Sequence, residues 1–263
     1  MQESSFADKP SVDLTRRFGG LTRLYGASAL ERLAKMRVGI IGIGGVGSWA
    51  VEALARSGVG ALTLIDLDSI AESNINRQIH ALDITLGQAK VQAMRERIEL
   101  INPYCRVDTV EDFVEPENAG ALLDNFDVVI DAVDSVRAKI AIILSCRQAG
   151  IRIIVAGGAG GKTDPSCIRI SDLARTEQDP LLAKVRRKLR SEYGFPRDLQ
   201  KSFGIETVFS TEPLRYPDVD GAAANTLQGL ACAGYGSSVV VTACFGFFAA
   251  SRAIAQLLEK GPG

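Results

Sequence analysis

One short segment, N-I-N-R-Q-I-H-A-L-D-I-T-L-G-Q-A-K, gathers polar and basic residues between Asn74 and Lys90. Arg77 offers a planar guanidinium that binds two phosphate oxygens at once, and Lys90 offers a compact point charge. Together they could hold the β- and γ-phosphates of a nucleoside triphosphate. The segment favours this chemistry over hydride transfer, because a dehydrogenase needs no second polar cluster just after its ribose-binding acid.

Two carboxylates, Asp131 and Asp134, follow an apolar run in the sequence V-V-I-D-A-V-D-S. We expect them at the carboxyl end of a parallel strand, where ligands bind in sheets of this kind. A carboxylate at that position can hold a Mg²⁺ ion that bridges phosphate oxygens. For Asp131 a second interpretation stays open, in which its side chain caps the following helix.

A glycine-rich loop, G-I-G-G-V-G, comes earlier in the chain. Gly42, Gly44 and Gly47 form the pattern G-x-G-x-x-G, and Gly45 is an additional glycine. Such glycines permit a tight turn and bring backbone N–H groups and a helix N-terminus close to a phosphate. Asp66 follows, where a carboxylate accepts hydrogen bonds from ribose hydroxyls. Alone, this pattern predicts a nucleotide, and NAD, FAD, S-adenosylmethionine and ATP all fit it.

The elements that must position these groups alternate along the chain. Apolar, β-branched runs predict strands at Val38–Ile43, Ala61–Asp66, Arg106–Val110, Asp127–Ala132, Ile151–Ala156 and Cys167–Ala174. Helical spacing predicts helices at Leu24–Ala34, Val46–Ser57, Gln88–Ile101, Ser135–Ala149 and Asp179–Glu192. This alternation predicts an α/β fold, with a Rossmann-like, mostly parallel sheet and helices on both faces.

We interpret the chain as a single domain, 1–263, with three parts. A helical arm (14–36) precedes a nucleotide-binding core (37–156), and a substrate- and dimer-side extension (157–263) follows. The extension holds a second glycine loop, G-G-A-G-G-K-T-D-P, and then a long stretch from Tyr193 to Gly236 with little periodicity. A connection of that length usually covers an active site or is partly disordered.

Composition excludes several classes of function. The 263 residues carry a formal net charge of −1, so the protein as a whole is no general polyanion binder and any nucleic-acid contact needs a local patch. A basic helix offers one, although a solvated face explains it equally well: Lys184, Arg186, Arg187, Lys188 and Arg190. Five cysteines without any C-x-x-C argue against a zinc site or a disulfide framework and suit a reducing cytoplasm.

The longest apolar segment runs from Ser237 to Leu258 and is interrupted by Arg252. Its small residues predict a buried helix, and a membrane-associated tail is the alternative. We therefore expect a cytoplasmic protein, with membrane association through this segment as the second possibility. The single histidine, His80, lies close to the basic cluster, but we expect a packed or surface side chain and no catalytic role.

With these residues in view, the chain resembles a known family. The segments GIGGVGS, LIDLD, NINRQ, GQAK and DAVDS are similar to the adenylation domain shared by ThiF, MoeB, HesA and ubiquitin-activating enzymes. More narrowly, RRFGG, RLYG, NRQIHAL, INPYCRV, GGAGGKTDP, DPLLAKVRRKLR, VFSTEP and VTACFGF resemble its TcdA-type branch, the tRNA threonylcarbamoyladenosine dehydratases. The resemblance covers about Arg16 to Ala255.

This resemblance implies an ATP-dependent enzyme that activates a carboxylate as an acyl-adenylate. In the dehydratase branch the carboxylate is the threonyl group of N6-threonylcarbamoyladenosine, next to the tRNA anticodon, and the modified base then cyclises with loss of water. The implied partners are the tRNA substrate, a second copy in a homodimer, and cysteine desulfurase or sulfur-acceptor proteins. The implied small molecules are ATP and Mg²⁺.

The resemblance also implies a role for each site residue. Four glycines would line the ATP phosphates, Asp66 would hold the ribose, three side chains would contact the phosphates, and Asp134 would bind Mg²⁺. The glycines are Gly42, Gly44, Gly45 and Gly47, and the phosphate contacts are Asn74, Arg77 and Lys90. Arg17, in RRFGG, is similar to an arginine that reaches into the partner subunit's site in dimeric relatives. It completes a catalytic set with Arg77, Lys90 and Asp134.

Two departures from the family pattern matter. MoeB and ThiF carry paired C-x-x-C zinc ligands, and their absence here favours the dehydratase branch. The dehydratases also carry more basic residues before their cysteine-containing loop, which here reads T-L-Q-G-L-A-C-A-G-Y-G. Cys232 in this loop is a candidate persulfide acceptor, but we favour a spectator thiol because the cyclisation needs no enzyme thiolate.

Two other classes of function stay open at this point. One is an adenylating enzyme for the C-terminus of a ubiquitin-like or sulfur-carrier protein, against which the missing zinc cysteines speak. The other is a nicotinamide-dependent oxidoreductase or a non-catalytic nucleotide sensor, against which Arg77 and Lys90 speak.

Overall fold

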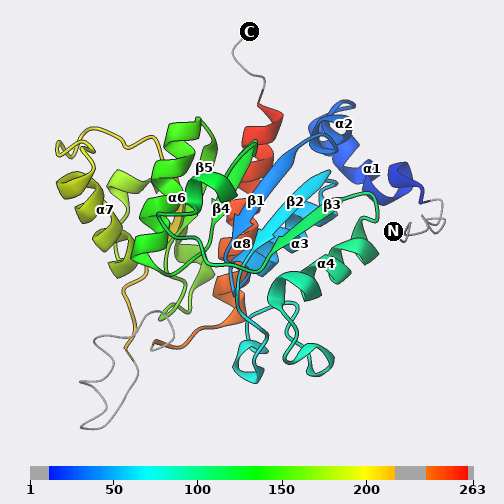
Figure 1. Cartoon of the computed structure of the whole chain (residues 1–263), viewed down its shortest axis with the longest axis horizontal. Helices are drawn as coiled ribbons and strands as arrows, with labels where there is room; N and C mark the ends of the chain where they lie inside the picture. The colour runs from blue at the N-terminus through cyan, green and yellow to red at the C-terminus, as the bar shows by residue number, and fades with distance from the viewer. Residues whose placement is uncertain (1–11, 217–234, 260–263) are drawn as a thin grey trace.

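The computed structural model describes residues 12–216 and 235–259, and within them seven strands form one sheet (Figure 1). The strands are β1 (Arg37–Ile41), β2 (Ala61–Ile65), β3 (Arg106–Val110), β4 (Val128–Asp131), β5 (Arg152–Ala156), β6 (Ile168–Asp172) and β7 (Glu206–Ser210). Their order is β3-β2-β1-β4-β5-β7-β6. Neighbouring strands are parallel except β6, which runs antiparallel to β7. This confirms the predicted mostly parallel sheet.

The strand order places a binding edge at β1 and β4. From β1 the chain adds β2 and β3 on one side, and it then returns to add β4 and β5 on the other. In the register, Ile41 at the end of β1 lies opposite both Ile65 and Asp131. Sheets with such a reversal bind ligands in the crevice beyond the carboxyl ends of these strands. The loops after β1, β2 and β4 therefore meet at the expected site.

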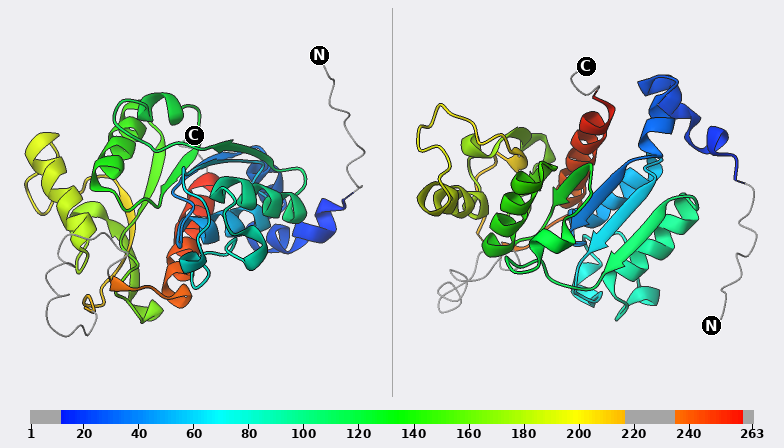
Figure 2. Two further views of the ribbon diagram at one scale, coloured as in Figure 1. Left: turned by 60° about the horizontal axis from the view of Figure 1, so that its bottom comes forward. Right: turned by 45° about the horizontal axis from the view of Figure 1, so that its top comes forward.

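Helices cover both faces of the sheet (Figure 2). The α-helices are α1 (Leu14–Tyr25), α2 (Ala29–Leu33), α3 (Gly47–Arg56), α4 (Lys90–Ile101), α5 (Ala119–Leu122), α6 (Val136–Ala149), α7 (Pro180–Glu192) and α8 (Val239–Leu258). Short 3₁₀ turns are η1 (Glu72–Asn74), η2 (Asp83–Thr85), η3 (Pro165–Cys167) and η4 (Leu173–Arg175). One hydrophobic cluster joins the sheet to α3, α4 and α8, and a second joins the opposite face to α5, α6 and α7.

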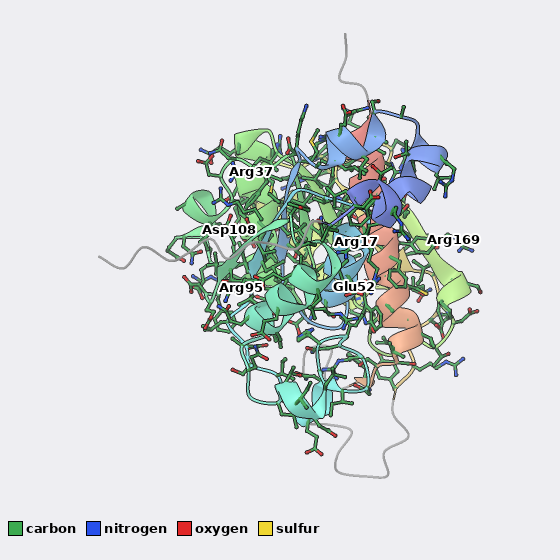
Figure 3. The ribbon with its side chains drawn as sticks, turned by 90° about the vertical axis from the view of Figure 1, so that its right-hand side faces the viewer. Arg17, Arg37, Glu52, Arg95, Asp108 and Arg169 are labelled. Carbon is green, nitrogen blue, oxygen red and sulfur yellow. The ribbon has the colours of Figure 1, made fainter. Side chains whose placement is uncertain are left out.

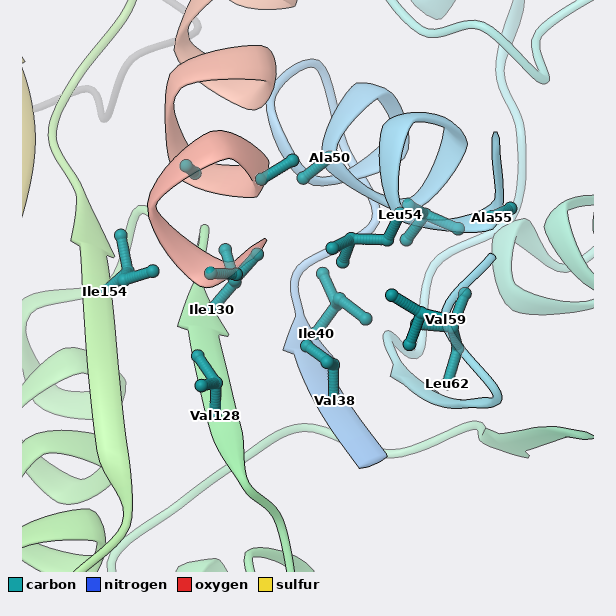
Figure 4. Close-up of a cluster of buried hydrophobic side chains, with 14 of the residues drawn as sticks. Val38, Ile40, Ala50, Leu54, Ala55, Val59, Leu62, Val128, Ile130 and Ile154 are labelled. Atoms are coloured by element: carbon teal, nitrogen blue, oxygen red, sulfur yellow. The ribbon is translucent and has the colours of Figure 1, made fainter. Parts of the chain in front are cut away.

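The central strands are apolar because both of their faces are buried. Val38 and Ile40 of β1 belong to the cluster with α3 and α8 (Figure 4), whereas Ile41 belongs to the cluster on the other face. In β4, Val128 and Val129 divide between the two clusters in the same way. Strands buried on both sides require continuous apolar runs, which is the pattern that predicted them.

The C-terminal apolar segment forms α8, which lies against the sheet and α3. Its core-facing side chains include Val241 and Phe245, both fully buried. A Cβ at Gly246 would lie 2.5 Å from the carbonyl oxygen of Val46 and 2.8 Å from Cβ of Trp49, so only glycine permits this close packing. The described part of the chain has one helix long and apolar enough to span a membrane, α8 itself, and half of its most apolar window is buried in the fold. The predicted buried helix is confirmed.

Of two local features, the sequence predicted one only with coarse bounds and missed the other. The RRFGG segment lies inside α1, within the range expected for the helical arm, and the first turn of α1 is capped by Asp13, which accepts a hydrogen bond from the N–H of Arg16 at 3.0 Å. Buried Phe18 anchors that helix despite its two glycines. Strand β7 was missed because its short run, E-T-V-F-S, lies in a stretch rich in glycine and proline, and only pairing with β5 and β6 reveals it.

Candidate active site

The glycine loop after β1 is shaped by two glycines that no other residue can replace. Gly42 has φ of +85°, and a Cβ there would lie 2.9 Å from the backbone of Ala132. A Cβ at Gly47 would overlap the carbonyl oxygen of Gly42, at 1.8 Å. These two residues build the turn itself. Gly44 and Gly45 are different, because a Cβ at either position would meet only side chains that come from the polar segment Asn74 to Lys90 and from α8.

Those side chains place the predicted phosphate-binding segment over the glycine loop. The Arg77 Cγ atom lies 3.3 Å from the Cβ position of Gly45, and Nε2 of Gln78 lies 3.9 Å from that of Gly44. The Arg77 backbone is fixed in turn, because its carbonyl oxygen accepts a hydrogen bond from the indole of Trp49 at 2.9 Å. The Arg77 guanidinium stays at the rim, where Nη1 donates to the carbonyl oxygen of Ser73 at 2.6 Å.

Asp66 joins the end of β2 to the glycine loop. Its Oδ2 accepts a hydrogen bond from the N–H of Ile43 at 2.6 Å, and its Oδ1 accepts one from the N–H of Asp68 at 2.8 Å. Burial raises the pKa of Asp66, while the Lys90 ammonium 3.8 Å away and the two backbone donors oppose that rise. Because each carboxylate oxygen has two lone pairs, Asp66 can still accept from ribose hydroxyls.

Lys90 and Asn74 have defined partners within the site. Nζ of Lys90, a buried residue at the start of α4, donates to Oδ2 of Asp68 at 2.6 Å. Oδ1 of Asn74 accepts from the N–H of Ala71 at 3.1 Å, so this side chain braces its own turn. The sequence analysis did not select Asp68 or Trp49. Asp68 had a visible signal in the repeated acid of L-I-D-L-D, whereas the Trp49 contact depends on the tertiary structure.

The acid that ends β4, Asp131, and the acid that follows it, Asp134, differ in burial and in their surroundings. Asp131 is fully buried and accepts from Nζ of Lys139, also fully buried, at 3.0 Å. Burial raises the pKa of Asp131, and the Lys139 charge and the N–H of Val133 oppose that rise. Asp131 neither faces the loops nor caps α6, because Ser135 is the cap. Asp134 is exposed between β4 and α6, at the edge where the glycine loop lies.

The ThiF family model matches residues 18–262. The chain belongs to the ThiF family. It is 49% identical over 246 residues to a tRNA threonylcarbamoyladenosine dehydratase of Haemophilus influenzae, covering 93% of this chain and 94% of the relative. It is also 49% identical over 253 residues to the enzyme of the same name from Escherichia coli, with the same coverage. A crystal structure of the E. coli enzyme, TcdA, in complex with ATP is 48% identical and superposes with a TM-score of 0.84 over 92% of this chain and 94% of that one.

Within this ThiF-family fold, Arg17 lies far from the glycine loop of its own subunit. Its Nη1 donates to the carbonyl oxygen of Ile101 at 2.7 Å, at the last turn of α4, whereas Lys90 opens the first turn. Those two ends of α4 are about 17 Å apart at 1.5 Å per residue. Figure 3 faces this side of the molecule, where Arg17 and Glu52 are labelled. Gly19 and Gly20 make no close approach in the described chain, since a Cβ at either would meet only Arg23, at 3.9–4.0 Å.

A second polar cluster occupies the same sheet edge, in the loop after β5. The Glu212 carboxylate accepts from the N–H groups of Thr163 and Asp164, each at 2.9 Å. Burial raises the pKa of Glu212, but these donors outweigh it and leave the pKa lowered. Nζ of Lys162 donates to the carbonyl oxygens of Gln178 and Glu212. The sequence identified this stretch only as a glycine loop, because Glu212 is 49 residues from the loop it holds.

His80 is a buried side chain, as expected. Burial lowers the pKa of His80 to about 4, and the charges of Lys90 and Arg97 lower it further. Neither ring nitrogen has a hydrogen-bond partner among the described residues. The imidazole is therefore neutral at pH 7 and positioned for packing, not for proton transfer.

Proposed function

We propose that this chain is an ATP-dependent tRNA threonylcarbamoyladenosine dehydratase. The observation that carries the proposal is the 49% identity, over 93% of the chain, to enzymes of that name. The glycine loop beneath Arg77 and Gln78 supports it, because this arrangement suits a triphosphate. The reaction adenylates the threonyl carboxylate of N6-threonylcarbamoyladenosine next to the tRNA anticodon, and the modified base then cyclises.

In the first step, a carboxylate oxygen of the substrate attacks the α-phosphorus of ATP. The bond from that phosphorus to the bridging oxygen breaks, and pyrophosphate leaves. Gly42, Gly44, Gly45 and Gly47 shape the loop around the phosphates, and Asp66 holds the ribose. Asn74, Arg77 and Lys90 bind phosphate oxygens, with Lys90 shifting from Asp68 toward the ligand. Such a step depends on alignment and charge neutralisation more than on proton transfer.

In the second step, the carbamoyl group of the same modified side chain attacks the activated carbonyl carbon and gives up a proton. AMP leaves with the former carboxylate oxygen, so the net change in the nucleoside is the loss of water. No enzyme nucleophile is required, and Cys232, which lies outside the described residues, is a spectator in this scheme.

The side chains that could act as metal ligands at the site fit a magnesium ion that is held mainly by phosphates. No group of three or more histidine, cysteine or acidic side chains converges in the described part of the chain. Mg²⁺ commonly binds through one or two carboxylates together with substrate phosphates, and exposed Asp134 supplies such a ligand. When bound, the ion would neutralise charge on the triphosphate.

We also propose a two-fold homodimer in which Arg17 of one subunit completes the site of the other. The position of Arg17, at the far end of α4 from Lys90, supports this, because in its own subunit the guanidinium cannot contribute to the site. Two-fold dimers are the commonest closed assembly. Cysteine desulfurase or sulfur-acceptor proteins remain proposed partners. A cytoplasmic location is supported by the burial of α8 inside the fold.

Nucleoside mass spectrometry tests the function directly. tRNA from cells that lack this protein should contain only the open, uncyclised nucleoside, and the wild-type gene should restore the cyclic form. ATP–pyrophosphate exchange with the purified protein separates the alternatives. Stimulation by tRNA supports the proposal, whereas stimulation only by a small carrier protein would identify a carrier-adenylating enzyme. ATP and NAD titrations test the oxidoreductase alternative.

A further inference from the structure

The outer face of α7 carries a basic recess that the adenylation chemistry does not use. Its volume is about 330 Å³. Four arginines line it, together with Ala183 and Ser191: Arg186, Arg187 and Arg190 from α7, and Arg197 from the segment that follows. We call this set the arginine recess. It stands out because the whole chain carries a net charge of only −1.

None of the four arginines forms an ion pair with another described residue. Glu192 and Asp198 are exposed nearby but pair with none of them. Nη2 of Arg190 is buried and has no hydrogen-bond partner in the described chain. Leaving a buried charged donor unpaired is unfavourable. The recess thus holds positive charge that no carboxylate of the described residues neutralises.

Two of the guanidinium groups are held in place before any ligand binds. Arg186 donates to Oγ1 of Thr176, and Nε of Arg190 donates to the carbonyl oxygen of Pro196 at 3.2 Å. The Arg190 guanidinium also lies over the Phe203 ring, 5.1 Å from its centre. Burial lowers the pKa of Arg186, and the neighbouring charge of Arg190 lowers it further. Fixed, planar forks of this kind match the oxygens of a phosphate.

Exposed cations continue the recess along the helix. Lys184, Arg187 and Lys188 are exposed on successive turns of α7, whereas Leu182 and Leu189 turn inward. The helix dipole explains a cation in the last turn, such as Arg190, but not cations along the whole length. A row of charges on a helix of about 20 Å suits a linear polyanion better than a single small anion.

Helix α7 starts at the same edge of the sheet as the proposed ATP site. Its N-cap, Asp179, accepts a hydrogen bond from the N–H of Gly158, in the glycine loop that follows β5 at the carboxyl edge of the sheet. From there α7 extends along the outer side of the fold, beyond α6 (Figures 1 and 2). A chain of phosphates on α7 would therefore lead away from the edge where ATP is proposed to bind.

We propose that the arginine recess and the exposed face of α7 bind phosphates of the tRNA backbone next to the base being modified. This inference rests on the proposed function, because it names the surface that holds the same substrate. Its role is positioning: the cations contact the RNA away from the reacting atoms and bring the modified base to the site.

The test is a triple variant, Arg187→Ala with Lys188→Ala and Arg197→Ala, in the full-length protein. Each replaced side chain is exposed, so the fold should be retained. The charge-matched control is Lys35→Ala with Arg37→Ala and Arg106→Ala, three exposed cations at the opposite, amino edge of the sheet. Filter binding with tRNA at several salt concentrations gives both the affinity and its salt dependence.

Loss of three phosphate contacts should weaken tRNA binding by about ten- to a hundredfold near physiological salt and lower the slope of log K against log salt by about two to three. The control should bind like the wild type, and ATP affinity should be unchanged in all three proteins. The effect should appear in KM for tRNA and not in kcat at saturation.

Four results would overturn the inference or separate it from the proposed function. Wild-type affinity and slope in the α7 variant would overturn it, as would an equal loss in the control. Retained tRNA binding with lost binding to anionic vesicles would assign the recess to a membrane surface instead. Wild-type protein that neither binds nor dehydrates tRNA would refute the proposed function itself, before any variant is compared.

Discussion

Replacing Arg77 with alanine tests the central assignment of the site. The Arg77 stem packs over Gly45 in the nucleotide loop, and the proposal gives its guanidinium a phosphate contact. Removing one such contact from a preorganised site costs about 2–4 kcal/mol of transition-state stabilisation, or roughly a 30- to 1000-fold fall in kcat. The cost to folding is smaller. The variant loses side-chain hydrogen bonds to Ser73 and Asn76, which contribute about 1–2 kcal/mol in total. The hydrogen bond from the Trp49 indole remains, because its acceptor is the backbone carbonyl oxygen of residue 77.

The assay is tRNA-stimulated ATP–pyrophosphate exchange, with urea unfolding as the check on the fold. Arg77→Lys keeps the charge but loses the planar fork, so its activity should fall between those of the wild type and the alanine variant. Arg106→Ala removes an exposed arginine at the amino edge of the sheet and should behave as the wild type. A folded Arg77→Ala protein that exchanges pyrophosphate within about threefold of the wild-type rate would refute the phosphate-binding role.

Four further predictions follow from the same structure. Asp134→Asn should slow Mg²⁺-dependent turnover far more than it weakens metal-free ATP binding, and undiminished activity at limiting Mg²⁺ would contradict the metal assignment. Inactive Arg17→Ala and inactive Asp134→Asn subunits should recover about a quarter of wild-type activity when they are mixed and re-equilibrated. The reason is that half of the dimers are then heterodimers, and each heterodimer carries one intact site of its two. No recovery in verified heterodimers would exclude a shared site. Lys139→Met should cost about 3–5 kcal/mol of unfolding free energy by leaving Asp131 buried and unpaired, and adding Asp131→Leu should restore much of it in urea titrations. His80 takes up a proton only near pH 4 when folded but near pH 6.5 when unfolded, so its contribution of up to about 3 kcal/mol, complete above pH 6.5, is lost as the pH falls toward 4. His80→Asn should flatten that part of the stability profile, and an unchanged slope between pH 7 and 5 would argue against the buried, neutral imidazole.

The sequence predicted the nucleotide-binding half of the fold well because local and global signals agree there. Apolar runs gave β1, β2, β4 and β5, and glycines at Gly42 and Gly47 are required by the turn itself. The segment that carries Arg77 and Lys90 lies near that turn because it follows β2, the strand next to β1. The phosphate-binding roles of the two side chains stay a prediction.

Other features could not be predicted from the sequence because they depend on residues far away in the chain. The pairing of Asp131 with Lys139 becomes visible only when α6 packs over β4, so Asp131 and Asp134 look equivalent in the chain although one is buried and the other exposed. The same holds for Glu212, whose carboxylate accepts hydrogen bonds from a loop about 49 residues earlier in the chain. Strand β7 is recognised only from its pairing with β5 on one side and β6 on the other.

The packing of Gly246 on the first turn of α3 has a consequence for biosynthesis. The glycine loop and α3 leave the ribosome early, but the helix that covers them is the last element of the described fold to be made. Roughly 200 residues separate the two, so the nascent nucleotide loop waits about 10–40 s for its cover at ordinary elongation rates. A nascent or truncated chain without α8 therefore lacks part of the core beneath the loop.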